Sequence, residues 1–297
     1  MLESNCPICA AHALSFLKAK DYNRCISQKL FLYHKCTVCG LIYLVNVPED
    51  LGAYYPKVYY DIPKDRESLL ASNAHDQYKL RIVQQFIMDG RLLEIGPAFG
   101  SFSCLAKQAG FDVEVIEMDE RCCNFIQNEL GIKAVQANNP IEALVGLSGY
   151  DVITLWQVIE HLPEPFLALK AFVKKLLPGG TLVISTPNPA AFQFWILGRF
   201  WAHLDAPRHL TLIPSDLLID QMKAMGLECV LLTTTDKGSM GWDSFGWAVS
   251  LRNFFSYPPL KHAAHLTGRL LTKLLLPIER SSQRGSAYTA IFQKKTD

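Results

Sequence analysis

Short apolar runs alternate with stretches of helical periodicity through the centre of the chain. Runs of strand length lie at residues 92–95, 113–116, 132–136, 150–155 and 181–188. Between them, apolar residues recur at helical spacing over 102–109, 119–130 and 166–177. Strands that alternate with helices in this way are typical of βαβ units. The pattern therefore predicts an α/β fold with a doubly wound, mostly parallel sheet.

Further elements are expected on both sides of this region. Towards the C-terminus, the pattern predicts a helix at 217–225, strands at 227–233 and 288–293, and an amphipathic helix at 262–277. Towards the N-terminus, it predicts a strand at 41–45 and an amphipathic helix at 72–89, which precedes the first strand of the sheet.

Length, composition and charge set broad limits. The chain has 297 residues, of which 49% are apolar, so it can form one large domain and a small one. The formal net charge of +1 gives no overall electrostatic reason to expect a nucleic-acid partner. We read no signal peptide at the N-terminus and no transmembrane segment, so a cytoplasmic location is expected.

Four of the nine cysteines form two closely spaced pairs. Cys6 and Cys9 make one C-x-x-C knuckle, and Cys36 and Cys39 make the other. Two such knuckles supply four thiolates, which suit a tetrahedral zinc ion. A redox dithiol is the competing interpretation, but it requires a single C-x-x-C. We therefore expect a zinc ribbon over residues 1–47, which is too small to fold without its metal.

Small residues separate the first strand from its helix. Gly96, Ala98 and Gly100 allow a tight turn and a close ligand approach, and the following helix offers unpaired N–H groups. This spacing matches neither the dinucleotide-binding fingerprint nor a P-loop. The next strand ends in Glu117, where a carboxylate can accept hydrogen bonds from both hydroxyls of a ribose.

Three segments together resemble the class I S-adenosylmethionine (SAM)-dependent methyltransferases of the type 11/23-like group. They are the glycine turn with Glu94 and Glu117, the segment 156–165 with its Glu-His-Leu, and the Leu-Pro-Gly-Gly, strand, Pro-Asn pattern at 177–188. The resemblance covers residues 91–235 well. It implies a Rossmann-like methyltransferase domain over 91–297 whose last strand is antiparallel and lies at the edge. The ribbon and the tyrosines after it resemble a module found in some bacterial methyltransferases of glycans and secondary metabolites.

The resemblance also implies which residues form the site. The residues expected to contact SAM are Glu94, Gly96, Ala98, Gly100, Glu117, Met118, Asn138 and Gln157. Ala98 replaces a more usual glycine, which implies a slightly tighter turn. His161 and His209 are the candidate bases, and Asp205 is a candidate partner of His209. A structural role for His161, at the turn after its strand, remains an equal alternative.

The acceptor site is expected between the methyltransferase core and its additions. The aromatic segment 189–212 is interpreted as a substrate lid, although any one of its aromatic residues could equally belong to a core helix. Residues 48–90 form the connector. Its tyrosines could line the acceptor site, or pack the connector onto the main domain. Trp242, Phe245 and Trp247 are further candidates for enclosing the substrate.

The leading hypothesis is methyl transfer to a hydroxyl of a small or carrier-linked acceptor, such as a sugar or secondary metabolite. N- and C-methylation remain open. RNA methylation is an alternative, but the near-neutral charge and the lack of an Asn/Asp-Pro-Pro-Tyr/Phe motif disfavour it. A second alternative is a non-catalytic scaffold that binds a protein partner through the zinc ribbon. The helix at 262–277 could touch a membrane surface or a partner subunit. No oligomeric state is predicted.

Overall fold

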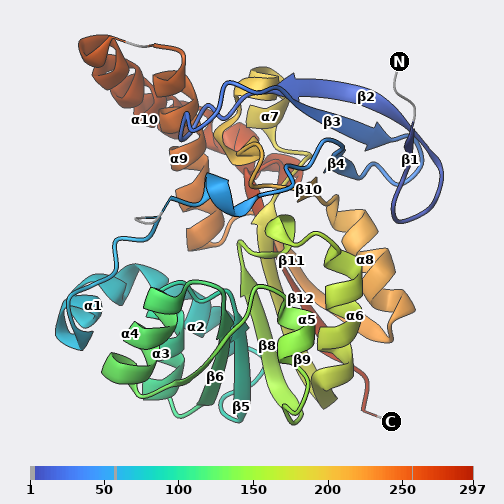
Figure 1. Ribbon diagram of the computed structural model, residues 1–297, viewed down its shortest axis with the longest axis vertical. Helices are drawn as coiled ribbons and strands as arrows, with labels where there is room; N and C mark the ends of the chain where they lie inside the picture. Colours follow the sequence, from blue (N-terminus) through green and yellow to red (C-terminus); the bar gives the residue numbers. More distant parts are fainter. Residues whose placement is uncertain (1–3, 57–58, 256, 297) are drawn as a thin grey trace.

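A seven-stranded sheet forms one half of the protein (Figure 1). The computed structural model describes residues 4–56, 59–255 and 257–296. Across the sheet the strand order is β11 (Leu227–Thr233), β12 (Ala287–Lys294), β9 (Leu176–Pro187), β8 (Tyr150–Trp156), β5 (Arg91–Ile95), β6 (Asp112–Glu117) and β7 (Lys133–Gln136). The five strands from β9 to β7 are parallel, and β12 runs antiparallel to both of its neighbours. This confirms the predicted Rossmann-like methyltransferase fold with an antiparallel last strand.

Helices cover both faces of the sheet, as expected of a doubly wound fold. One face packs against α1 (Arg66–Ser72), α2 (Gln77–Val83), α3 (Ser101–Gln108) and α4 (Glu120–Leu130). The other packs against α5 (Pro140–Ala143), α6 (Pro165–Lys175) and α8 (Ser215–Ala224). Along β5, Leu92 contributes to the first core and Leu93 to the second, because successive side chains of a strand point to opposite faces.

Three local predictions differ from the structure. The expected helix 72–89 corresponds to the 3₁₀ turn η2 (Asn73–Asp76) followed by α2, which ends at Val83. The polar side chains Asn73 and Asp76 are buried in η2. Residues 178–180 lie inside β9 instead of ending a helix, since β9 starts pairing with β8 at Leu176. The last strand, β12, is not at the edge, because β11 pairs along its outer side.

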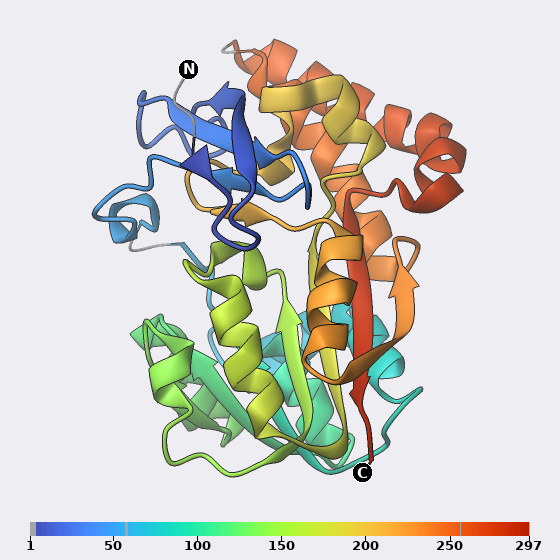
Figure 2. The ribbon, with the colours of Figure 1, turned by 90° about the vertical axis from the view of Figure 1, so that its right-hand side faces the viewer.

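A second sheet contains the N-terminal residues. It consists of β1 (Ser4–Asn5), β2 (His12–Ala19), β3 (Phe31–Cys36), β4 (Ile42–Leu44) and β10 (Thr211–Leu212). The strand β10 belongs to the segment 189–212 and pairs antiparallel with β4, which would otherwise leave an open edge. Figure 2 shows this sheet above the parallel sheet. The N-terminal module is therefore joined to the rest of the chain by backbone hydrogen bonds.

A third hydrophobic core joins the N-terminal sheet to the segment 189–212 and to a helical hairpin. The segment contains α7 (Phe192–Leu197) and the 3₁₀ turns η4 (Gly198–Phe200) and η5 (Ala202–Leu204), and the hairpin consists of α9 (Lys237–Asn253) and α10 (Pro258–Arg280). Tyr33, Trp201 and Trp247 are buried together in this core. The remaining 3₁₀ turns are η1 (Gly52–Tyr54), η3 (Ile159–His161) and η6 (Ser281–Gln283). Within the described residues, none of the helices combines the length and apolar character needed to cross a membrane.

Candidate active site

A cavity of about 560 Å³ opens beyond the carboxyl ends of β5 and β8, a location that is typical of ligand sites in open α/β sheets. We call it the central cavity. The turn after β5, the segment after β8, the N-terminal module, the connector, the segment 189–212 and α9 all contribute side chains. Its lining includes Asn23, Arg24, Tyr59, Tyr60, Gly96, Ala98, Gln157, Glu160, His161, His203, Asp205, His209, Trp242, Phe245 and Arg252.

The turn after β5 presents backbone atoms to this cavity. Gly96 has φ +64°, and a Cβ atom there would lie 2.7 Å from a methyl group of Val158, so the position requires glycine. Ala98 adopts φ +52° although it has a side chain, and its N–H donates to Oε2 of Glu117 at 3.0 Å. The turn is therefore fixed to the end of β6.

Glu117 is buried at the end of β6, and its carboxylate is held by backbone donors. Besides the Ala98 N–H, the N–H groups of Met118 and Asp119 donate to Oε1 at 2.7 and 2.9 Å. Burial raises the pKa of Glu117, although these N–H groups oppose the effect. Met118 follows with its side chain about half exposed. These contacts orient the carboxylate that was predicted to bind ribose.

Other predicted cofactor residues are not among those that line the central cavity. Glu94 is buried on the side of α3 and accepts a hydrogen bond from the Ser103 hydroxyl, and burial raises its pKa to about 7. Gly100 packs against α4, where a Cβ atom would lie 2.9 Å from Ile126 Cγ1. Asn138 lines a separate hollow of about 170 Å³. Glu117 and Met118 also lie outside the lining.

Gln157, by contrast, is in the lining of the central cavity. It has φ +58°, directly after the last residue of β8. Its Nε2 donates to Ser185 Oγ at 3.0 Å, so the amide is fixed between the ends of β8 and β9. Of the predicted cofactor residues, the structure thus brings Gly96, Ala98 and Gln157 to the cavity in which both candidate bases lie.

The two candidate bases are in contact. The rings of His161 and His209 have centroids 4.6 Å apart and meet edge to face. Nδ1 of His161 lies 3.0 Å from the carbonyl oxygen of Arg208, and Nδ1 of His209 lies 2.7 Å from that of His203. A carbonyl can only accept, so both Nδ1 atoms carry hydrogen and both Nε2 atoms keep a lone pair. Burial lowers the pKa of both, that of His209 to about 3, so both are neutral at pH 7.

Glu160 is a site residue that the sequence-based prediction did not include. Its side chain is fully buried, Oε2 accepts from the Thr186 hydroxyl at 2.9 Å, and Oε1 lies 4.0 Å from Nε2 of His209. Burial raises the pKa of Glu160 to about 8. The ligand atoms of Glu160, His161 and His209 lie within 4.8 Å of one another, a spacing at which a cation could also bind. The sequence signal that could have identified Glu160 is its position directly before His161 in the Glu-His-Leu motif.

The tyrosines of the connector have different roles. Tyr59 and Tyr60 line the central cavity, and the Tyr55 hydroxyl oxygen lies 3.1 Å from Nδ1 of His161. Tyr54 instead packs edge to face on Phe31 in the third core. The connector tyrosines are thus divided between the central cavity and the third core.

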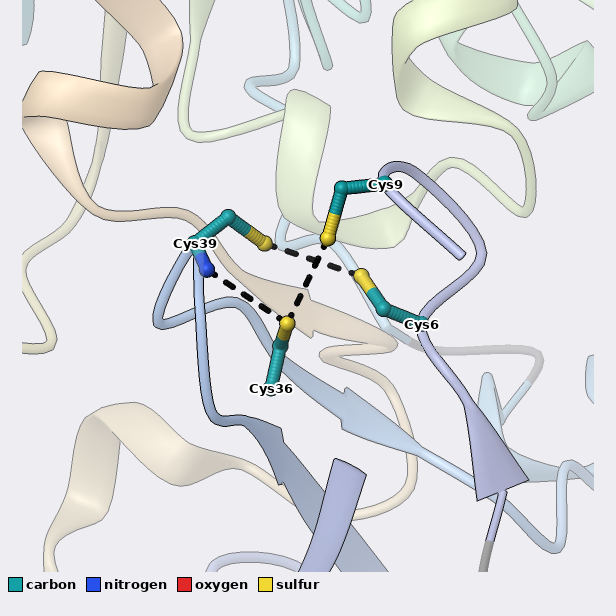
Figure 3. A group of neighbouring side chains, drawn as sticks. All are labelled: Cys6, Cys9, Cys36 and Cys39. Atoms are coloured by element: carbon teal, nitrogen blue, oxygen red, sulfur yellow. Dashed lines mark hydrogen bonds between the residues drawn. The ribbon is translucent and has the colours of Figure 1, made fainter. Parts of the chain in front are cut away.

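The four paired cysteines come together at one end of the N-terminal sheet (Figure 3). Their sulfur atoms lie within 4.8 Å of one another, with 3.6 Å between Cys6 and Cys39 and 3.5 Å between Cys9 and Cys36. These distances exceed an S–S bond and are close to those between thiolates that share a tetrahedral zinc ion. The N–H groups of Val38 and Cys39 also point to Cys36 Sγ, each at 3.4 Å. This donor set fits one zinc ion.

A larger hollow, of about 1000 Å³, lies between β2, β3 and α7. Its lining includes none of the predicted catalytic, cofactor or metal residues. The convergence of motif residues therefore identifies the smaller, central cavity as the candidate active site.

Comparison with known proteins shows the family to which the chain belongs. Residues 66–232 match the methyltransferase domain family. A ubiquinone biosynthesis O-methyltransferase of Bordetella avium is 32% identical over 125 residues, which are 40% of this chain and 52% of that protein. The protein of that name from Cereibacter sphaeroides is 30% identical over 173 residues, 54% of this chain and 67% of that protein. The chain thus spans about half the length of the first relative.

Solved structures share the fold. A SAM-dependent methyltransferase from Archaeoglobus fulgidus superposes with a TM-score of 0.52 at 20% identity, covering 77% of this chain and 97% of that one. The [4+2]-cyclase SpnF superposes with a TM-score of 0.51 at 14% identity, over 75% and 82% of the two chains. At such identities these similarities establish the fold alone. The family match covers more than half of the chain, and the chain therefore belongs to the methyltransferase domain family, as its motifs predicted.

Proposed function

We propose that this protein transfers a methyl group from SAM to a hydroxyl of a small or carrier-linked acceptor, such as a sugar or secondary metabolite, in the central cavity. One observation carries the proposal: the turn at Gly96 and Ala98 lines the same cavity as the contacting pair His161 and His209. The relatives named O-methyltransferases support oxygen as the methylated atom.

The cofactor residues would hold the nucleoside end of SAM. The oriented carboxylate of Glu117 has the chemistry to accept ribose hydroxyls, and the glycine at position 96 leaves the backbone open to a ligand. When bound, SAM supplies a methyl group that is already activated on a sulfonium. The protein therefore has to place the acceptor oxygen in line with that carbon and to remove its proton.

The histidine pair is the candidate acceptor of the proton from the acceptor hydroxyl. Each ring is fixed through its Nδ1, so that Nε2 has the free lone pair and a defined direction. Oε1 of Glu160 lies 4.0 Å from Nε2 of His209. Because burial raises the pKa of Glu160 to about 8, this carboxyl is mostly protonated at pH 7, and it can stabilise an imidazolium at His209 only in its ionised form. Trp242 and Phe245 offer an apolar wall for the acceptor, while Arg24 and Arg252 add positive charge.

We also propose that Cys6, Cys9, Cys36 and Cys39 hold one structural zinc ion. The ion would fix the two knuckles, and through them the module that supplies Asn23 and Arg24 to the cavity. Zinc here has no role in the chemical step.

The test is incubation of the purified protein with deuterated-methyl SAM and pools of hydroxylated sugars and metabolites, read by mass spectrometry. A product that carries the labelled methyl group on oxygen is expected. His161→Ala and His209→Ala should each lower turnover more than SAM affinity, whereas His75→Ala, at an exposed histidine of η2, should do neither. Transfer to carbon or nitrogen, or normal turnover in both cavity variants, would refute the proposed acceptor or base.

A further inference from the structure

Helix α10 carries a row of exposed aliphatic side chains. Leu266, Leu270, Leu274 and Ile278 follow one another at intervals of four residues, and each is between 41% and 64% exposed. Residues at this spacing lie on one side of an α-helix, and twelve residues span about 18 Å. The row is therefore a continuous apolar stripe on the surface, which we call the α10 stripe.

The α10 stripe is held on the outside of the molecule, because a different face of α10 packs against α9. Ala264, Gly268 and Thr272 are buried there, and a Cβ atom on Gly268 would lie 2.5 Å from the Cα atom of Ala248. This close contact between backbones fixes the rotation of α10. The predicted amphipathic helix thus packs on its own domain through small residues and presents its larger apolar residues to the outside.

The hairpin that carries the stripe is strongly basic. Residues 237–286 include seven lysines and arginines and two acids, Asp243 and Glu279, both of them buried. Seven minus two gives +5, against +1 for the whole chain, so the remaining residues sum to −4. Arg269 and Lys273 lie beside the stripe and are exposed. These two cations thus add positive charge beside the stripe, whereas Arg252 of the same hairpin lines the central cavity.

Exposed aromatic residues lie before α10 and on α7. Phe254, Phe255 and Tyr257 are exposed at the connection between α9 and α10, and Trp195 on α7 is 81% exposed. Both views place α7 and α10 at the end of the molecule that faces away from the parallel sheet (Figures 1 and 2). Aromatic side chains around a basic apolar helix are typical of protein surfaces at the boundary between lipid headgroups and acyl chains.

We propose that α10 binds the surface of an anionic membrane. The α10 stripe enters the headgroup boundary, and Arg269 and Lys273 contact anionic headgroups. A second copy of the chain fits less well, because two α10 helices side by side would bring basic rows together without exposed acids on either hairpin. The proposal is independent of the acceptor and of the reaction.

The test is cosedimentation of the 297-residue, zinc-loaded protein with large unilamellar vesicles. Vesicles with 30% phosphatidylglycerol in phosphatidylcholine should bind the protein, and pure phosphatidylcholine should bind it at least about tenfold more weakly. Arg269→Ala and Lys273→Ala should each lower the partition coefficient roughly fivefold on the anionic vesicles. Added salt should weaken binding in the same direction.

A matched pair of variants isolates the stripe. Leu270→Glu/Leu274→Glu should abolish binding, whereas Val145→Glu/Leu167→Glu, at exposed apolar residues of the methyltransferase domain, should leave it unchanged. Thermal unfolding and sedimentation velocity show whether each variant folds and what its mass is. Absence of binding to anionic vesicles would overturn the proposal, and so would a wild-type dimer that the Leu270→Glu/Leu274→Glu variant dissociates. Equal loss in both double variants would likewise exclude the stripe.

Discussion

Arg208 and Asp21 form a fully buried ion pair, with 2.7 Å between Nη2 and Oδ1. Asp21 belongs to the N-terminal module, and Arg208 belongs to the segment that carries His209. Arg208 also pairs with Asp205 at 2.7 Å, and Asp205 accepts from Asn23 Nδ2 at 2.6 Å. Asp205, which was predicted to assist His209, is thus engaged by Arg208 and Asn23. The network holds the two walls of the central cavity together.

Removing one charge of this network should destabilise the protein. In Asp21→Asn, the buried guanidinium of Arg208 keeps its ion pair with Asp205 but loses the one with Asp21. We therefore expect the free energy of unfolding to fall by roughly 3 kcal/mol. Urea denaturation measures it. The control is Glu49→Gln, at an exposed acid of the same region, which should change stability by less than about 0.5 kcal/mol. Equal effects in the two variants would contradict the role of the pair.

Glu94 should make stability depend on pH. Burial raises its pKa from 4.5 to about 7, so folding favours the neutral carboxyl, and the native state loses stability as pH rises from 4.5 to about 7. Glu94→Gln removes this loss, and the variant should gain up to roughly 3 kcal/mol at pH 8 and much less at pH 5. Denaturation at both pH values, with Glu129→Gln at an exposed site as control, checks the slope. A Glu94→Gln profile parallel to the wild type would exclude the effect.

Replacing Gly96 should weaken cofactor binding, because a side chain at this position would clash with Val158 in addition to straining the backbone. Gly96→Ala combines a strained positive φ with a contact of 2.7 Å to Val158, whereas Gly110→Ala has φ +101° and nothing within 4 Å of the new Cβ atom. Both variants should lose about 1 kcal/mol or more of stability from strain. Affinity for S-adenosylhomocysteine should fall at least about tenfold in Gly96→Ala alone. Similar affinities in both variants would remove this turn from the cofactor site.

Zinc should be present at one equivalent per chain and should depend on the four cysteines. Elemental analysis of protein purified without chelator is the measurement. Cys9→Ser should lower the zinc content and the unfolding temperature, because three thiolates bind zinc less tightly than four. Cys25→Ser, at an exposed cysteine outside the cluster, is the control. Metal-free wild type, or equal zinc in both variants, would refute the zinc site.

The sequence predicted the structure best where a single short segment of the chain determines it. The stretch from Leu92 to Phe102 predicted a strand, a turn and the start of a helix, and the structure has all three. The two cysteine knuckles likewise predicted a cluster, which the structure brings together. The fold class followed from such local signals because each strand and its helix lie next to each other in the chain.

Relations between distant residues were harder to predict. The contact of His161 with His209 depends on how the segment 189–212 returns to β4, and no local pattern specifies that path. The helix α9 was missed because its apolar residues are not confined to one face and glycines interrupt them. The end of the expected helix 72–89 was placed too late, because its apolar stripe continues to Ile87, beyond the last residue of α2 at Val83. Asn138 was placed from the resemblance, yet it lines a separate hollow.

The account depends most on one claim, that the turn after β5 and the carboxylate of Glu117 hold the cofactor. Calorimetric titration of the zinc-loaded protein with S-adenosylhomocysteine tests it directly. We predict binding in the micromolar range, at least tenfold weaker binding by Glu117→Ala, and unchanged binding by Asp112→Asn, at an exposed acid of the same strand. Failure of the wild type to bind, or equal affinity in Glu117→Ala and wild type, would contradict the claim.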